Sequence, residues 1–409
     1  MNKRILVTGA QGFIGTWLFF SLNRSGYTVY GLDNRYSPGE RLYDVIGGDG
    51  FLADSYTADL TDYPAIERIV HAGKFDLILN LGANAIVPRA FREPHLTFMS
   101  NTVGTLNVLE AVRTSGYPTA VFCVTTDKVY ENHNSGEPFA ETDLLGGKDI
   151  YSVSKSSAEY IARAYALTHN PGSVVHTLRL GNVVGGGDWS LNRLIPDLIN
   201  SYREGREFAV RYPEATRPFQ HVIDVVKSIE ALYQKVLAGE VNHYDVWNLG
   251  PRDNTYDYVS NVLETFNREI GPLKVVDDVN RVKEDIYLSV DVTKVSTHVA
   301  PPKFTSAESI VLAFDWYKKY RNCLAIAQVC GARDFEHTRI AILVCQEKTG
   351  KRSVISCANG NGTQIYKNRA PVRVIYKKTT IIDPNATFDR YDSRRTGGQF
   401  NSGVSSSIR

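Results

Sequence analysis

Short apolar runs alternate with longer amphipathic stretches along the first 130 residues, and this alternation constrains the fold most strongly. The apolar runs are continuous, which is typical of strands that are buried on both faces of a parallel sheet. We therefore predict an α/β chain with a Rossmann-type, doubly wound parallel sheet. The predicted strands span residues 4–9, 28–33, 75–82, 119–126 and 173–183, and helices span 15–26 and 102–116, with another that begins near Tyr151.

Three glycines follow the first predicted strand, in the stretch VTGAQGFIG. Gly9 permits a tight turn, Gly12 lets the backbone approach a pyrophosphate, and Gly15 lets the helix pack closely on the strand. The free N–H groups at the helix N-terminus would then face the anion. Asp33 ends the next predicted strand, where it would bind an adenosine ribose and repel a 2′-phosphate. The pattern predicts an NAD site, and the alternative is that the glycines serve only a tight turn.

The stretch YSVSK places Tyr151 and Lys155 four residues apart, on one face of a predicted helix. A tyrosine with a pKa near 10 is a poor base at neutral pH. A neighbouring lysine ammonium and a nicotinamide cation would lower that pKa by favouring the phenolate. We predict that this pair is catalytic; the alternative is a pair on the surface of a helix.

The stretch VTTDKVY places Thr126, Asp127 and Lys128 at the end of a predicted strand. Ligands of open parallel sheets bind outside the carboxyl ends of the strands, so these residues should face the same site as Tyr151. Oxidation of an alcohol needs only a hydroxyl group here. The additional acid and base indicate that further protons move; the alternative is a surface ion pair.

The helix and strand pattern loosens after about Gly185, which predicts a smaller mixed α/β lobe. We assign residues 1–184 to the NAD-binding domain, to which later strands return, and residues 185–331 mainly to a substrate-binding lobe. Residues 332–409 carry 14 Lys+Arg against 6 Asp+Glu and predict a basic, partly disordered extension. This extension is either a contact for nucleic acid or another acidic surface, or a solvated segment without a partner.

Composition excludes several classes of protein. The five cysteines form no C-x-x-C pair, which argues against zinc and thioredoxin-like sites and favours a reducing cytoplasm. No stretch of 18 apolar residues is present, so no membrane span is expected, and the N-terminal stretch has no apolar run of the signal-peptide kind. The formal net charge of +2 indicates no particular partner.

Several longer motifs carry a family resemblance. The spacing GxxGxxG is similar to that of the extended short-chain dehydrogenase/reductases. The segments GFIGTWL, VPRAFREP, TTDKVYEN, GNVVGGGDWSLNRLIPDLI and ATRPFQHV resemble the nucleotide-sugar 4,6-dehydratases, and among these the branch that acts on CDP-glucose. The resemblance runs from Lys3 to about Ala332. Ile14 replaces the family's usual lysine, Pro88 replaces a common arginine, and KEDIYLSVD is a looser match.

The resemblance implies a set of binding residues. The NAD contacts would be Gly9, Gln11, Gly12, Phe13, Ile14, Gly15, Asp33, Asp59, Leu60, Leu81, Gly82, Ala83, Asn101, Tyr151 and Lys155. The sugar-nucleotide contacts would be Asn182, Arg193, Arg217 and His221, where arginine suits a two-pronged grip on a diphosphate. For these four residues the alternative is a role in the loops themselves, such as a salt bridge, and for Asn101 it is an ordinary helix N-cap. Related enzymes pair as dimers through two helices per subunit, so a homodimer is expected.

The resemblance also implies a mechanism without a metal. Tyr151 takes the proton of the carbon-4 hydroxyl while NAD accepts the hydride, Thr126 hydrogen-bonds that oxygen, and Lys155 tunes Tyr151 and holds the nicotinamide ribose. Asp127 protonates the departing carbon-6 hydroxyl, and the hydride returns to carbon 6. The product is a 4-keto-6-deoxy sugar nucleotide.

Two questions stay open at this stage. Asp127 needs a raised pKa to act as an acid, and Lys128 beside it works against that. Lys128 would remove the carbon-5 proton only if burial lowered its own pKa. Epimerisation or plain oxidoreduction of a sugar nucleotide, and a non-catalytic NAD-sensing role, are the competing functions.

Overall fold

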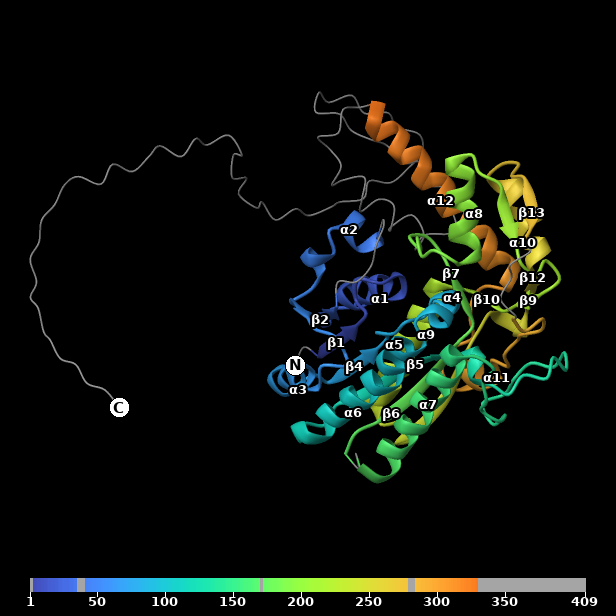
Figure 1. The fold of residues 1–409 in the computed structure, drawn as a ribbon. Coiled ribbons are helices and arrows are strands. Elements are labelled where there is room, and N and C mark those ends of the chain that lie inside the picture. Colours follow the sequence, from blue (N-terminus) through green and yellow to red (C-terminus); the bar gives the residue numbers. More distant parts are fainter. Residues whose placement is uncertain (1–2, 35–40, 170–171, 279–283, 330–409) are drawn as a thin grey trace, which may run out of the picture. The chain divides into compact units, whose positions relative to one another are not determined.

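The computed structural model describes residues 3–34, 41–169, 172–278 and 284–329, shown as ribbon in Figure 1. The predicted basic extension at 332–409 lies outside these residues. Within the described ranges, no helix combines the length and the apolar character that crossing a membrane requires.

A seven-stranded sheet forms the centre of the fold, in the order β11-β6-β5-β4-β1-β2-β3. All of its neighbouring strands run parallel. This sheet confirms the predicted Rossmann-type fold class. Its strands are β1 (Arg4–Thr8), β2 (Thr28–Asp33), β3 (Asp54–Thr57), β4 (Leu77–Asn80), β5 (Ala120–Thr126), β6 (Val175–Leu180) and β11 (Tyr244–Leu249).

The continuous apolar runs are explained by two hydrophobic cores, one on each face of the sheet. Along β1, Ile5 and Val7 belong to one core and Leu6 to the other. Along β5, Phe122 belongs to the first core, whereas Val121 and Cys123 belong to the second. Successive side chains of a strand point to opposite faces, so both sets must be apolar.

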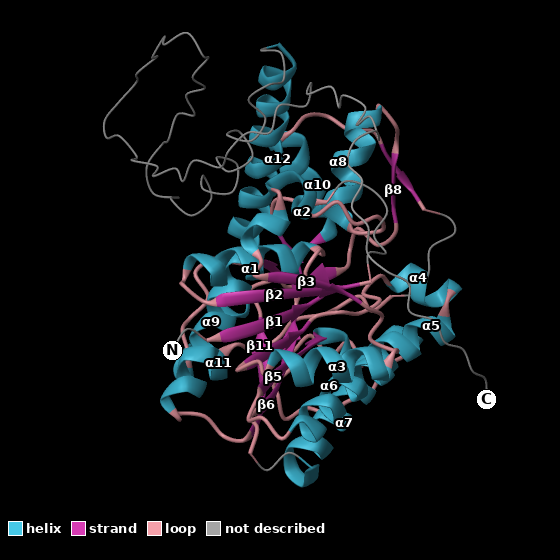
Figure 2. Cartoon of the chain, turned by 90° about the vertical axis from the view of Figure 1, so that its left-hand side faces the viewer, coloured by secondary structure: helices cyan, strands magenta, loops and turns pink. Residues whose placement is uncertain are grey.

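Helices cover both faces of this sheet, as Figure 2 shows. On one side lie α1, α9 and α11, which contribute to the first core; on the other lie α3, α6 and α7, which contribute to the second. Their bounds are α1 (Phe13–Arg24), α3 (Tyr63–Gly73), α6 (Gly104–Ser115), α7 (Ile150–Ala164), α9 (Val222–Ala238) and α11 (Thr293–His298).

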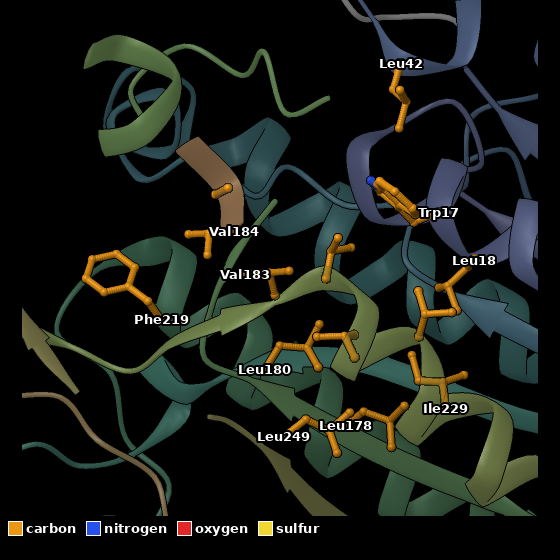
Figure 3. Close-up of a cluster of buried hydrophobic side chains, with 14 of the residues drawn as sticks. Trp17, Leu18, Leu42, Leu178, Leu180, Val183, Val184, Phe219, Ile229 and Leu249 are labelled. Atoms are coloured by element: carbon orange, nitrogen blue, oxygen red, sulfur yellow. The ribbon is translucent and has the colours of Figure 1, made fainter. Parts of the chain in front are cut away.

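The first core joins elements that are far apart in the sequence. In Figure 3, Leu178 of β6 and Leu249 of β11 lie beside Ile229 of α9. Trp17 of α1 belongs to the same core, and its Nε1 donates a hydrogen bond to the carbonyl oxygen of Gly186 at 2.9 Å. The glycine-loop helix is thereby tied to the segment that follows β7.

Three two-stranded sheets follow in the later part of the chain: β7 with β10, β9 with β12, and β8 with β13. Their bounds are β7 (Asn182–Val184), β8 (Phe208–Val210), β9 (Thr216–Arg217), β10 (Phe219–His221), β12 (Asp257–Tyr258) and β13 (Val275–Asp277). The accompanying helices are α8 (Leu194–Glu204), α10 (Val259–Glu269) and α12 (Ser306–Val329). The remaining helices of the described chain are α2 (Leu42–Ile46), α4 (Val87–Arg92) and α5 (Pro94–Phe98), with short segments η1 (Gly48–Phe51), η2 (Met99–Val103), η3 (Asp127–Val129), η4 (Tyr165–His169) and η5 (Arg252–Asn254).

The strand order reverses between β1 and β4, because β2 and β3 follow on one side of β1 and the next strands on the other. Ligands of doubly wound sheets bind outside the carboxyl ends of the strands at such a point. The glycine loop follows β1, and Thr126 ends β5. The topology therefore directs both predicted sites to the same edge of the sheet.

Candidate active site

A side chain would be strained at two of the three glycines of the loop, at Gly9 because of its backbone conformation and at Gly15 because of close packing. Gly9 has a φ of +68°, and a Cβ there would lie 3.1 Å from the backbone nitrogen of Gly82. A Cβ on Gly15 would lie 2.2 Å from the carbonyl oxygen of Gly9. At Gly12 the nearest atom to an added Cβ is the Gly9 carbonyl oxygen, at 3.2 Å. The first and third glycines thus serve the turn and the helix packing.

The N-terminus of α1 offers hydrogen-bond donors to an anion. Gly12 is its N-cap, no side chain caps the helix, and the first turn carries no acidic residue. The backbone N–H groups of this turn, which include those of Phe13 and Ile14, have no partner within the helix. Such a terminus favours a phosphate group.

Asp33 lies against this loop from the end of β2, where its Oδ2 accepts a hydrogen bond from the backbone nitrogen of Gln11 at 3.1 Å. Asp59 lies nearby, since Asn34 donates to its Oδ2 at 3.4 Å. Burial tends to raise the pKa of Asp59, but hydrogen bonds from the backbone and side chain of Thr61 lower it overall. Both predicted acids therefore lie at the carboxyl ends of β2 and β3, and Asp33 contacts the glycine loop.

The loop after β4 is held by β1 and lies beneath Leu60. Thr8 Oγ1 accepts from the backbone nitrogen of Gly82 at 2.9 Å and donates to Asn80 Oδ1 at 2.9 Å. A Cβ on Gly82 would come within 2.7 Å of the side chain of Leu60. Leu81, Gly82 and Ala83 are all partly exposed.

Asn101 connects this loop to the helix that carries the Tyr–Lys pair. Its Oδ1 accepts from the backbone nitrogen of Asn84 at 2.7 Å, and its Nδ2 donates to the Asn84 carbonyl at 3.1 Å and to Ser154 Oγ at 2.9 Å. Asn101 lies inside η2, a π-helical turn that joins α5 to α6, and is not an N-cap. Its side chain orders backbone at the site.

The chain thus provides the features that a dinucleotide needs. These are a glycine at the N-cap of α1, helix N–H groups without a partner in the helix, an acid at the end of β2 for the ribose, and a partly exposed loop after β4. The residues present fit NAD on these grounds.

The predicted pair lies on α7, and neither side chain is on the surface. Asp149 caps the helix, because its Oδ1 accepts from the backbone nitrogen of Ser152 at 3.0 Å. Tyr151 is 7% exposed and Lys155 is 6% exposed. A surface helix pair, the alternative for this motif, is inconsistent with this burial.

Burial shifts the pKa values of both residues of this pair. Burial raises the pKa of Tyr151 to about 12, although a hydrogen bond with Thr126 and the charge of Arg193 act to lower it. Burial lowers the pKa of Lys155 to about 8. Lys155 Nζ donates to the carbonyl oxygen of Val124 at 3.0 Å. In the protein alone, burial therefore outweighs the expected stabilisation of the phenolate.

At the end of β5 the chain turns into η3, with Thr126 as its N-cap. Thr126 Oγ1 lies 3.1 Å from Asp127 Oδ1, and the Oδ2 atom of Asp127 is buried without a hydrogen-bond partner among the described residues. Asp127 is 2% exposed, so the alternative of a surface ion pair does not hold. Lys128 Nζ lies 3.9 Å from Glu284 Oε2.

Burial raises the pKa of Asp127 to about 6, although Lys128, the hydrogen bond with Thr126, and Arg217 all act to lower it. A carboxyl group in this range is partly protonated near neutral pH. It can therefore act as a general acid.

Two of the four predicted substrate contacts interact electrostatically with predicted catalytic residues. Arg193 is the residue before α8, pairs with Asp188 at 3.2 Å, and acts on Tyr151. Arg217 on β9 is 6% exposed and acts on Asp127. Both arginines form the salt bridges that the alternative predicts, Arg193 with Asp188 and Arg217 with Glu284, and their contact with a substrate diphosphate stays a prediction.

Asn182 and His221 lie on the paired strands β7 and β10. His221 is buried and caps α9 by accepting a hydrogen bond from the backbone nitrogen of Ile223 at 3.3 Å. Burial lowers the pKa of His221 to about 3, so it is neutral. Its Nε2 is buried without a hydrogen-bond partner among the described residues. Contact of Asn182 and His221 with substrate stays a prediction.

Two acidic residues of the site were not predicted. Glu284 contacts Lys128, Arg211 and Arg217, but its segment carries only the loose motif KEDIYLSVD. Glu159, four residues after Lys155, forms a buried ion pair with Arg179. The i+4 spacing from Lys155 was the available signal for Glu159, whereas contacts across more than 60 residues left none for Glu284.

No group of three or more His, Cys, Asp or Glu side chains suited to a metal ion occurs in the part of the chain that the structure describes.

The chain is similar in sequence and fold to proteins that act on sugar nucleotides. Residues 5–250 match the model of the NAD dependent epimerase/dehydratase family. The chain is 30% identical over 332 residues to a CDP-glucose 4,6-dehydratase from Salmonella typhimurium, which covers 78% of this chain and 91% of that protein. It is 29% identical over 331 residues to a dTDP-glucose 4,6-dehydratase from Streptomyces griseus, covering 79% and 96%. The crystal structure of a Thermus thermophilus UDP-glucose 4-epimerase in complex with NAD shares the fold, with a TM-score of 0.67 at 24% identity over 77% of this chain and 99% of that one.

Proposed function

The chain belongs to the NAD dependent epimerase/dehydratase family, and from this membership we propose that it removes water from a nucleoside diphosphate hexose, with CDP-glucose as its substrate. The product would be a 4-keto-6-deoxy sugar nucleotide. The observation that carries the proposal is Asp127, an acid with a raised pKa, buried at the end of β5 beside Thr126. Epimerisation and plain oxidation of a sugar nucleotide require no such acid.

The first step is removal of the carbon-4 hydroxyl proton by Tyr151. When bound, NAD supplies a hydride acceptor at carbon 4, a hydride donor at carbon 6 and a positive ring charge. Thr126 shares a hydrogen bond with Tyr151 and would hold the same substrate oxygen. Lys155 is held on the same helix face by the Val124 carbonyl and would contact the nicotinamide ribose.

The second step is loss of the carbon-6 hydroxyl. The carbon-4 ketone acidifies the carbon-5 proton, a base removes that proton, and the hydroxyl that leaves carbon 6 is protonated to water. Asp127 would supply this proton, because burial raises its pKa to about 6 and a fraction of the carboxyl groups is protonated near neutral pH. Lys128 forms an ion pair with Glu284. Removal of the carbon-5 proton by Lys128 stays a prediction.

Arg193 and Arg217 would bind the diphosphate of the substrate. Both act electrostatically on the catalytic residues, and guanidinium groups match phosphate oxygens in two-pronged geometry. Asn182 would contact the sugar from β7. The choice of cytosine as the base is supported by the 30% identity to a CDP-glucose 4,6-dehydratase.

The deciding experiment measures turnover with CDP-, dTDP-, GDP- and UDP-glucose and identifies the bound cofactor by mass. We expect CDP-glucose to give the base-labile absorbance of a 4-keto-6-deoxy product, with NAD unchanged at the end of the reaction. Formation of a 4-epimer, or net reduction of the cofactor, would contradict dehydration. Faster turnover of another nucleotide sugar would contradict only the substrate.

We also propose that the enzyme is a homodimer in the cytoplasm. The proposal rests on the pairing of related enzymes through two helices per subunit and on the cysteine usage of the chain. Sedimentation of the purified protein tests the first part.

A further inference from the structure

One carboxylate at the site has three positively charged partners. Glu284 Oε1 lies 2.5 Å from Arg211 Nη1, and its Oε2 lies 3.1 Å from Arg217 Nη2 and 3.9 Å from Lys128 Nζ. The Glu284 side chain is only 13% exposed. Two segments distant in sequence, η3 and the stretch from Arg211 to Arg217, therefore meet at this residue.

Two of these cations also act on Asp127. Lys128 is its neighbour on η3, and Arg217 reaches it from β9. The other groups around Asp127 are Thr126 at the end of β5, which is uncharged, and Tyr151 on α7, which interacts with it electrostatically. Two nearby positive charges favour the ionised form of a carboxyl group, and the ionised form cannot donate a proton.

We infer that Glu284 is a positioning residue that offsets the charges of Lys128 and Arg217 and so increases the fraction of Asp127 that is protonated near neutral pH. Its carboxylate draws the Lys128 ammonium toward itself and occupies the Arg217 guanidinium. The inference rests on the proposed function in one respect only: the proposed function has the Asp127 proton go to the carbon-6 hydroxyl.

The ionisation of the two carboxyl groups agrees with this division of roles. Burial raises the pKa of Asp127 to about 6 in spite of Lys128 and Arg217. Burial also acts to raise the pKa of Glu284, but Lys128, Arg211 and Arg217 together lower it. Glu284 therefore stays charged where Asp127 titrates, which suits a counter-charge and not a proton donor.

The test is a pH titration of Asp127 in the purified full-length protein without substrate. The probe is the infrared carbonyl stretch of its protonated carboxyl group, identified as the band that Asp127→Asn removes. In Glu284→Gln we expect the midpoint to fall by about one pH unit or more, because a nearby charge shifts a pKa by about one to three units. In Lys128→Met the midpoint should rise, and the double variant should return toward the wild-type value.

The adjacent residue provides a matched control. Asp285 pairs with Lys148 at 2.8 Å, so Asp285→Asn removes one negative charge from the same segment without touching the three cations. Its midpoint should equal that of the wild type. An unchanged midpoint in folded Glu284→Gln, or an equal fall in Asp285→Asn, overturns the inference.

Folding and function are separated in the same experiment. If Glu284→Gln does not fold, Lys128→Met decides, because a midpoint that fails to rise overturns the inference. The titration needs no turnover. A shifted midpoint without dehydration of CDP-glucose counts against the proposed function alone, and normal dehydration with an unchanged midpoint counts against the inference alone.

Discussion

Arg179 on β6 donates hydrogen bonds to both carboxylate oxygens of Glu159 on α7, from Nε to Oε1 at 2.9 Å and to Oε2 at 3.0 Å, and from Nη2 to Oε2 at 2.6 Å. The two side chains are 4% and 1% exposed. Thr125 Oγ1 donates to the same carboxylate at 2.7 Å. The helix that carries Tyr151 and Lys155 is thereby fixed against the strand that ends in Thr126.

Loss of this pair should destabilise the fold. Glu159→Gln leaves the Arg179 charge buried without its counter-charge, and such changes cost about 3–5 kcal/mol. Urea unfolding measures the loss. The control is Glu204→Gln, whose partner Arg206 is 58% exposed, and it should change the free energy of unfolding by less than about 1 kcal/mol. An equal loss of unfolding free energy in both variants would show that the buried pair stabilises the fold no more than the exposed pair does.

Gly15→Ala should remove NAD binding. Its Cβ would lie 2.2 Å from the Gly9 carbonyl oxygen, so α1 must move away from the loop, at a cost of about 1–3 kcal/mol. The NAD released by denatured protein, measured by mass, checks the prediction. Gly50→Ala is the matched control, because an added Cβ there meets nothing within 4 Å. Full NAD content in Gly15→Ala would contradict the assigned role of the glycine.

The fold class followed from the sequence because parallel strands buried on both faces must be apolar throughout. In β5, the change from the apolar residues FCV to the two threonines of FCVTT showed where the strand ends. Boundaries were less accurate. The helix predicted over 102–116 is the last part of a longer helical stretch that begins at Pro94, since the π-turn η2 joins α5 to α6 without a break.

The site was predictable where one short segment supplies the chemistry and not where side chains meet through the fold. The Tyr151–Lys155 spacing lies within one helix, so both residues share a face. The Glu284–Lys128 contact spans 156 positions and leaves no periodic signal. The sequence also carried no sign that burial raises the pKa of Tyr151, because burial is a property of packing and not of neighbours in sequence; the lowering expected beside a nicotinamide cation stays a prediction.

Asp127→Asn should stabilise the protein at pH 7. Burial raises the pKa of Asp127 from its ordinary value of 3.8 to about 6 in the folded state, so its contribution to stability is lost as pH rises between these values. An asparagine has no charge to bury. We expect a gain of about 1–3 kcal/mol at pH 7 that disappears near pH 4. Denaturant unfolding at both pH values measures it, and a gain that persists at low pH would point to a cause other than ionisation.

The same substitution should separate the two chemical steps. Asparagine cannot protonate the carbon-6 hydroxyl, so we expect elimination to slow by about 10²–10⁴-fold while hydride transfer from carbon 4 continues. Single-turnover absorbance of the bound cofactor would follow the first step, and product formation the second. In the wild type, kcat/KM should fall as pH rises above about 6, since the acid must be protonated; Asp127→Asn should lose this dependence. Equal slowing of both steps would remove Asp127 from the role of general acid.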